Sequence, residues 1–297
     1  MEGSGGRFWR VLNGKILSGP FLVAGIVNVT PDSFYDGGRH DSTDKAVEHA
    51  MRLVEDGADI LDVGGESTRP YADPVSLDQE LGRVVPVISG IRERLRLPGG
   101  ERVSVSVDTY KAACASAAIE AGADIVNDVS ACSRDPGLLD VLVQYKPGYV
   151  LMHSQGDPSV MQDAPRYDDV IADISAFFEK NLSRLVAAGL PEENIVLDPG
   201  IGFGKLLAHN LAILRDLPAF LSFGRPLYMG LSNKSFLEKR LGRTVSERGT
   251  ATTAATALTG AKGAFIHRVH DAAAAVDALR LAAELFPAVF TGKTAPR

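Results

Sequence analysis

The sequence predicts a (β/α)8 barrel, in which helices enclose eight parallel strands. Three observations predict it: eight short runs rich in Val, Ile and Leu, a polar or glycine-rich stretch after each run, and amphipathic alanine-rich segments between them. Near-continuous apolar strands that alternate with helices are typical of a parallel sheet covered by helices. A chain of 297 residues suits one such barrel. A doubly wound open sheet is the alternative, to which we give less weight.

The predicted strands and helices alternate along the chain. In order, the strand-like runs are residues 21–27, 59–65, 102–108, 124–130, 148–153, 194–200, 226–232 and 264–270. Helical patterns between and after them include "TDKAVEHAMRLVEDGA", "YKAACASAAIEAGA" and "DAAAAVDALRLAAELF". Gly57, Gly122 and Gly189 follow such patterns, which predicts left-handed caps at the ends of these helices.

The chain is expected to form one barrel domain with short extensions. We assign residues 1–20 to an N-terminal lead-in, expected to be a hairpin that plugs the bottom of the barrel. Residues 21–290 would form the barrel, and residues 291–297 a C-terminal tail. No low-complexity linker divides the sequence.

Composition excludes several classes of partner. The net charge of −6 argues against binding to nucleic acid or an anionic membrane, because these partners require clustered Lys and Arg. No apolar stretch approaches the length of a membrane span. Cys114 and Cys132 match no metal-binding spacing, so we expect buried thiols in a reducing compartment. The expected protein is soluble and cytoplasmic, and its ligand is a small molecule.

Every predicted strand ends in polar or glycine-rich sequence. The residues concerned are Asn28, Gly64-Gly65-Glu66, Asp108, Asn127-Asp128, His153, Asp198, Ser232 with Lys234, and Arg268 with His270. The carboxyl ends of barrel strands converge on one face, which carries the active site in this fold. Because buried polar groups are costly without partners, eight such endings predict a binding site there.

Three of these residues suit a flat heterocycle. The carboxylates of Asp108 and Asp198 can accept pairs of N–H bonds, and the amide of Asn127 can donate and accept. An amino-pyrimidinone edge needs such a set. The alternative is that the aspartates are helix N-caps. For Asp198 this alternative is weakened by Pro199, which keeps the preceding residue extended.

The last two strands carry candidate anion-binding residues. Arg268 and His270 are two apart, as are Ser232 and Lys234, which keeps each pair on one face if the strands continue that far. Asn233 would then point away. Phosphate sites near strands seven and eight recur in this fold, and Arg presents a planar fork to phosphate oxygens. His267 and His270 would face opposite sides, which argues against a zinc pair.

Two further segments border the expected site. "DPGIGFGK" lacks the spacing of a Walker A or dinucleotide loop, so its glycines are interpreted as allowing close approach of backbone to ligand. The long loop "GGESTRPYADPVSL" could close over a substrate together with the loop after residue 27. His153 is expected to be structural, and Met152 to offer a packing face for a flat ring.

The ordered motifs resemble one enzyme family. "NVTPDSF", "GGESTRP", "SVDTYKA", "AGADIVNDVSA", "LMHSQGDP", "DPGIGFGK", "GLSNKSF" and "RVHD" are similar to the signatures of dihydropteroate synthases, over about residues 22 to 290. The resemblance implies a (β/α)8 barrel transferase of folate biosynthesis. Such an enzyme joins 6-hydroxymethyl-7,8-dihydropterin diphosphate to 4-aminobenzoate and releases pyrophosphate. Sulfonamides compete for the aminobenzoate site in this family.

The resemblance also implies roles for individual residues. Asp108, Asn127, Met152, Asp198, Phe203 and Lys234 would bind the pterin; Asn28, Thr68, Arg69, Arg268 and His270 the diphosphate; and Phe34, Thr68, Pro70 and Ser232 the aminobenzoate. Asp108, Lys234, Arg268 and His270 would be catalytic. Asn28 would help to bind Mg2+, the implied cofactor. The family's usual dimer suggests a homodimer.

Two rival functions share the pterin-binding barrel. One is a methyltetrahydrofolate-dependent methyltransferase, against which "NVTPDSF" and the pair Arg268 and His270 argue. The other is a paralogue that binds pterin without catalysis. Asn233 stands where this family often has Arg, and Leu206 where a small hydroxyl residue is common, so these two positions depart from the pattern at the rim of the site.

Overall fold

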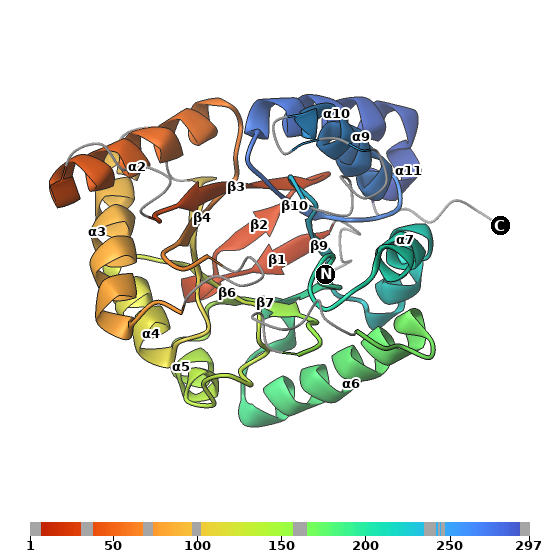
Figure 1. The fold of residues 1–297 in the computed structure, drawn as a ribbon, viewed down its shortest axis with the longest axis horizontal. Helices are drawn as coiled ribbons and strands as arrows, with labels where there is room; N and C mark the ends of the chain where they lie inside the picture. The colour runs from red at the N-terminus through yellow and green to blue at the C-terminus, as the bar shows by residue number, and fades with distance from the viewer. Residues whose placement is uncertain are drawn as a thin grey trace, which may run out of the picture.

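Eight parallel strands form the centre of the molecule, and helices surround them (Figure 1). The computed structural model describes residues 7–30, 38–67, 74–96, 102–156, 165–234, 242, 244 and 247–291. The barrel strands are β3 (Leu22–Asn28), β4 (Ile60–Gly64), β5 (Ser104–Asp108), β6 (Ile125–Asp128), β7 (Gly148–Met152), β8 (Ile195–Asp198), β9 (Tyr228–Gly230) and β10 (Ile266–Val269). Each lies within or one residue beyond a predicted run, so the eight predicted strands are confirmed.

The sheet closes into a barrel. Hydrogen-bonded neighbours follow the order β8-β7-β6-β5-β4-β3-β10-β9, and the pairs are parallel. A parallel bridge between Leu197 and Leu227 joins the two outer strands, and Leu197 N donates to Pro226 O at 2.9 Å. The (β/α)8 prediction is therefore confirmed, and the open doubly wound sheet is wrong.

Helices follow most strands and cover the outside of the barrel (Figure 1). They are α2 (Gly38–Glu55), α3 (Leu77–Leu95), α4 (Ala112–Ala121), α5 (Leu138–Tyr145), α6 (Val170–Ala188), α7 (Leu207–Arg215), α9 (Gly249–Gly260), α10 (Ala272–Leu285) and α11 (Pro287–Phe290), with 3-10 turns η1 (Leu12–Gly14), η3 (Glu192–Asn194) and η4 (Leu217–Phe223). Gly122 and Gly189 end α4 and α6 with φ of 118° and 113°. These are the predicted left-handed caps.

Alternation along the strands creates two cores. Outward residues such as Leu61, Val105 and Leu197 pack with apolar side chains of the helices. Inward residues such as Ile60, Val150 and Val196 form a second cluster inside the barrel. Because side chains alternate between faces, strands such as β8 present an apolar residue to both cores and still carry an inward polar residue at the carboxyl end.

A hairpin closes the amino-terminal end of the barrel. Strands β1 (Phe8–Arg10) and β2 (Ile16–Ser18) pair antiparallel, and Trp9 and Leu17 belong to the inner apolar cluster. Trp9 is fully buried, and its Nε1 donates to Asn194 O at 2.7 Å, next to the start of β8. The predicted hairpin plug is confirmed, and the carboxyl ends of the strands are left to form the site.

Both cysteines are buried free thiols, as predicted. Burial raises the pKa of Cys114 to about 12 and that of Cys132 to about 11, so neither is a nucleophile near neutral pH. Within the described residues, no helix has the length and apolar character needed to cross a membrane.

Candidate active site

Strand register brings three predicted residues together at the carboxyl end of the barrel. Asn28 pairs in register with Gly64, Gly64 with Asp108, and Asp108 with Asn127. These positions therefore lie at one level across β3, β4, β5 and β6. Beyond β6 in the sheet, Met152 at the end of β7 is in register with Asp198 at the end of β8. The predicted convergence of polar strand ends is present in the structure.

Neither aspartate at these ends caps a helix. Asp198 Oδ1 accepts from Gly200 N at 2.7 Å within a turn that precedes α7 by several residues. The residue at the N-cap of α4 is Lys111, three positions after Asp108. The N-cap interpretation is wrong for both, because each carboxylate ends its strand on the inner side of the barrel.

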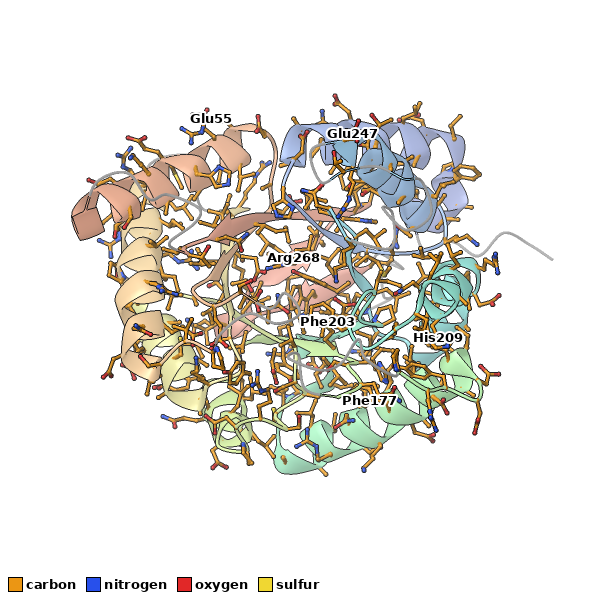
Figure 2. All side chains as sticks on the ribbon, viewed as in Figure 1. Glu55, Phe177, Phe203, His209, Glu247 and Arg268 are labelled. Carbon is orange, nitrogen blue, oxygen red and sulfur yellow. The ribbon has the colours of Figure 1, made fainter. Side chains whose placement is uncertain are left out.

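Arg268 links the strand ends through two ion pairs. Its Nη2 donates to Asp108 Oδ2 at 2.7 Å, and its Nε donates to Asp62 Oδ2 at 2.5 Å. Asn127 Nδ2 donates to the same oxygen of Asp62 at 3.0 Å. Figure 2 shows Arg268 inside the ring of helices. One cation thus lies between two carboxylates from β4 and β5.

Sequence reasoning missed Asp62. It is fully buried in the middle of β4, two residues before Gly64. The period of two places it on the same inward face as the strand end, one layer deeper. A charged residue inside an apolar run was the available signal, since a buried carboxylate needs a partner.

Burial raises the pKa of two carboxyl groups of the site, so they ionise less readily. It raises the pKa of Asp108 to about 7; Arg268 opposes the shift, and the neighbouring charge of Asp62 adds to it. The pKa of Asp198 is raised by burial too, and Lys234 is the main opposing charge. For Arg268 burial lowers the pKa, but Asp62 and Asp108 outweigh it and raise the value, so the guanidinium stays charged.

Lys234 and Phe203 lie together beside Asp198. Lys234 Nζ is 4.2 Å from the centroid of the Phe203 ring and donates to Ile201 O. Burial lowers the pKa of Lys234 to about 8, against the attraction of Asp198. The structure therefore places a cation and an aromatic ring next to a strand-end carboxylate, and all three belong to the predicted pterin set.

Ser232 and His270 meet, although not in the predicted way. Ser232 Oγ lies 2.8 Å from His270 Nδ1 and accepts from His270 N at 3.3 Å. However, β9 ends at Gly230 and β10 at Val269, so the expectation of extended pairs is wrong. Asn233 has φ of 57° in a turn, and its Nδ2 lies 3.5 Å from His270 Nδ1. Asn233 therefore does not point away, and its tolerance of the left-handed region permits this turn.

A cavity of about 280 Å3 borders Ser232 and His270. Its lining includes Thr252 and Thr256 of α9, together with Asn233. This side of the site is hydroxyl-rich, whereas the Asp108 side carries the ion pairs of Arg268 with Asp62 and Asp108. The predicted residues Phe34, Thr68, Arg69 and Pro70 lie outside the described residues.

The chain is similar to known pterin enzymes over most of its length. A family model described as "Pterin binding enzyme" matches residues 24–270. The dihydropteroate synthase of Escherichia coli (strain K12) is 44% identical over 259 residues, which cover 87% of this chain and 89% of that protein. The dihydropteroate synthase of Bacillus subtilis (strain 168) is 43% identical over 250 residues, covering 84% and 83%.

Solved structures of the same kind superpose closely. The Yersinia pestis dihydropteroate synthase with a sulfonamide drug complex has a TM-score of 0.85 and 41% identity, over 92% of this chain and 98% of that one. The Xanthomonas albilineans enzyme with 4-aminobenzoic acid has a TM-score of 0.84 and 41% identity, over 97% and 100%. The same organism's enzyme in complex with 7,8-dihydropteroate has a TM-score of 0.81 and 38% identity, over 96% and 100%.

Proposed function

The chain belongs to the dihydropteroate synthase family of pterin-binding enzymes, and we propose that it joins 6-hydroxymethyl-7,8-dihydropterin diphosphate to 4-aminobenzoate. The products are 7,8-dihydropteroate and pyrophosphate. The observation that carries the proposal is the joint placement of Asp108 and Asn127, side by side in register, with Arg268 bonded to the former. This arrangement offers acceptors to a pterin edge and a fixed cation to a departing anion.

The pterin subsite would lie between the ends of β5, β6 and β8. Asp108 and Asp198 supply acceptors for ring and amino N–H groups, and Asn127 can donate and accept. Met152 and Phe203 supply apolar surface for the two faces of a flat ring. The cation of Lys234, held over Phe203, would bind a pterin oxygen or nitrogen.

The diphosphate subsite would lie at the carboxyl end of β10, which contains Arg268 and is followed directly by His270. A guanidinium can grip phosphate oxygens with two parallel bonds. Ser232, predicted for aminobenzoate, contacts His270, which supports a place at the border between the diphosphate and aminobenzoate subsites. We retain Thr68 and Arg69 as further diphosphate ligands, and Phe34, Thr68 and Pro70 as aminobenzoate contacts.

Mg2+ is proposed as the cofactor, with Asn28 as a protein ligand. Asn28 ends β3 at the level of Asp108, and its amide oxygen is the type of donor that Mg2+ accepts. Among the described residues no group of three or more His, Cys, Asp or Glu could hold a metal ion. This fits an ion held largely by substrate phosphates and water. When bound, it would neutralise charge on the diphosphate.

The reaction would break the bond between the exocyclic methylene carbon and the diphosphate oxygen. The electron pair leaves with pyrophosphate, whose charge Arg268 and His270 stabilise. Positive charge on the methylene spreads into the dihydropterin ring, where the negative charge of ionised Asp108 stabilises it. The neutral amine of 4-aminobenzoate then attacks the carbon and loses a proton to water. No strong base is required, because a substituted anilinium is acidic.

The function is tested by incubating the protein with both substrates and Mg2+. Pyrophosphate and 7,8-dihydropteroate should appear in equal amounts. A silent paralogue would bind the pterin and release nothing. A methyltransferase would instead transfer a methyl group from methyltetrahydrofolate. Either of these outcomes would overturn the proposal.

Pterin binding is expected to release protons below neutral pH. A pterin edge that donates N–H bonds favours the ionised form of Asp108, whose pKa in the free protein is about 7. Affinity should therefore rise as pH increases from about 6 to about 7, since free protein binds more protons than complex in this range. Calorimetric titrations at about pH 6, in buffers of different ionisation enthalpy, measure the proton count. Uptake of protons, or none exchanged, would contradict the assignment.

A homodimer is proposed through the surface of α9 and α10. These helices are neighbours (Figure 1), and Leu258, Leu281 and Leu285 are 64%, 63% and 66% exposed. Large exposed apolar side chains on neighbouring helices are a feature of interaction surfaces. Leu281→Glu together with Leu285→Glu should convert the protein to a monomer in sedimentation velocity. Val186→Glu, on α6, is the control, because Val186 is also an exposed apolar residue. A wild-type monomer would refute the proposal.

A further inference from the structure

Lys205 is a buried lysine that the proposed reaction does not use. It is 3% exposed and lies in the loop between β8 and α7. Its Nζ lies 2.9 Å from His153 Nδ1 and donates to Phe203 O at 3.0 Å and His153 O at 3.3 Å. Within the described residues, its hydrogen-bond partners are thus a ring nitrogen and two main-chain carbonyls. Burying an ammonium group without a hydrogen-bonded carboxylate is costly, which makes its position informative.

The chemistry of this contact is directional. In its ammonium form Lys205 donates to Nδ1 of His153, which puts the ring proton on Nε2. Burial lowers the pKa of Lys205 to about 7, against the attraction of Asp198, so the neutral amine is also populated near neutral pH. Burial lowers the pKa of His153 to about 3, and Lys205 contributes to the shift, so the ring is neutral at physiological pH. The His153 ring is fixed in turn by edge contact with Phe177, 4.9 Å away between centroids. His153 is structural, as predicted, with Lys205 as its partner.

The loops that follow β7 and β8 are in close contact at the position where Lys205 bonds to both. A Cβ atom on Gly200 would lie 1.9 Å from His153 O, and one on Gly204 would lie 2.3 Å from Gln155 O. Both glycines have positive φ, at 68° and 62°. The loop after β8 therefore lies directly on the backbone after β7. Lys205 bonds to both of them, since its acceptors belong to His153 and Phe203.

The loop after β8 is also held from its other side. Asn210 on α7 is buried, and its Oδ1 accepts from Gly202 N at 2.7 Å. Its Nδ2 donates to Lys205 O at 3.3 Å. Phe203 lies between these two attachment points, so the orientation of its ring depends on both.

We propose that Lys205 is a positioning residue that sets the separation of Met152 and Phe203 and thereby the width of the pterin slot. This inference rests on the proposed function, because it names what the slot binds. The bonds from Lys205 to His153 and Phe203 form a brace between the two loops. Met152 immediately precedes His153, so one end of this brace is linked to one face of the pterin slot. The carbonyl of Phe203 is the other end. The brace should therefore matter for pterin and much less for aminobenzoate.

The test compares Lys205→Met with the wild-type protein. Its Kd for the pterin diphosphate should rise by about tenfold or more, because a looser slot loses fixed contacts on both ring faces. The KM for 4-aminobenzoate, measured at saturating pterin, should change by less than about twofold. Lys262→Met is the matched control, because Lys262 Nζ is exposed and donates only to Arg215 O among the described residues, at 2.8 Å.

His153 variants test the same contact from its other side. His153→Asn places an amide oxygen near the position of Nδ1 and should keep pterin affinity within about threefold, whereas His153→Leu should match Lys205→Met. The double variant of Lys205→Met and His153→Leu should lose no more affinity than either single variant, because both remove one contact. These variants decide the question if Lys205→Met does not fold.

Two outcomes would overturn the proposal that Lys205 sets the width of the pterin slot. One is a Lys205→Met protein that loses thermal stability but binds the pterin normally. The other is equal loss with His153→Asn and His153→Leu. Failure of the proposed function is distinguishable, since it would appear in the wild-type protein as an absence of pterin binding or of pyrophosphate release.

Discussion

Asp108→Asn is expected to lower kcat by about 10²- to 10³-fold while leaving the fold intact, the usual size of effect when one fixed electrostatic group is removed. Asn has the shape of Asp but lacks the negative charge that would stabilise a positive pterin ring. The fold should tolerate it, because burial already raises the pKa of Asp108 and makes its charge costly. Steady-state kinetics and thermal unfolding measure the two effects separately.

The control for this variant is Asp78→Asn. Asp78 lies exposed in the first turn of α3, so the control makes the same change in charge away from the site. Its kcat should equal that of the wild type. A kcat within about threefold of wild type for Asp108→Asn itself would refute the electrostatic role.

Arg268→Ala is expected to lower the free energy of unfolding by about 3–5 kcal/mol, because it leaves two buried carboxylates without their cation. Asp62 is fully buried and Asp108 nearly so, and both bond to Arg268. Urea denaturation measures the loss. Adding Asp62→Asn to Arg268→Ala should recover part of it, since one uncompensated charge is removed. A loss of less than about 1 kcal/mol would show that the ion pairs contribute little.

The same variant separates the two roles of Arg268. Its affinity for the pterin diphosphate should fall far more than its affinity for the pterin alcohol, which has no phosphate. Equal losses would assign Arg268 to the integrity of the site alone.

Fold and strand positions were predictable because this architecture buries both faces of each strand. Val105 and Val107 face the helices while Ser104, Ser106 and Asp108 face the interior, so β5 has no charged residue until its end. Asp108 marked the site from sequence because it breaks that pattern at a strand end. Its exact partners were not predictable, since Arg268 is 160 residues away in sequence.

Other parts of the site gave weaker signals. Asp62 lies inside its strand and not at the end, so it was not distinguished from the core. Lys205 ends the segment "DPGIGFGK", whose spacing argued against a phosphate-binding loop, and its contact with His153 depends on how two loops pack. Asn233 was assigned to an extended strand, whereas β9 ends at Gly230 and a turn follows. Loop packing and strand length are tertiary properties that local patterns do not specify.

The central claim is that one cavity mouth holds the pterin on carboxylates and the diphosphate on cations. A crystal structure with the pterin diphosphate bound tests it most directly. The account predicts the pterin edge within hydrogen-bonding distance of Asp108, Asn127 and Asp198, and phosphate oxygens on Arg268 and His270. A pterin bound elsewhere, or a diphosphate that contacts neither Arg268 nor His270, would contradict it.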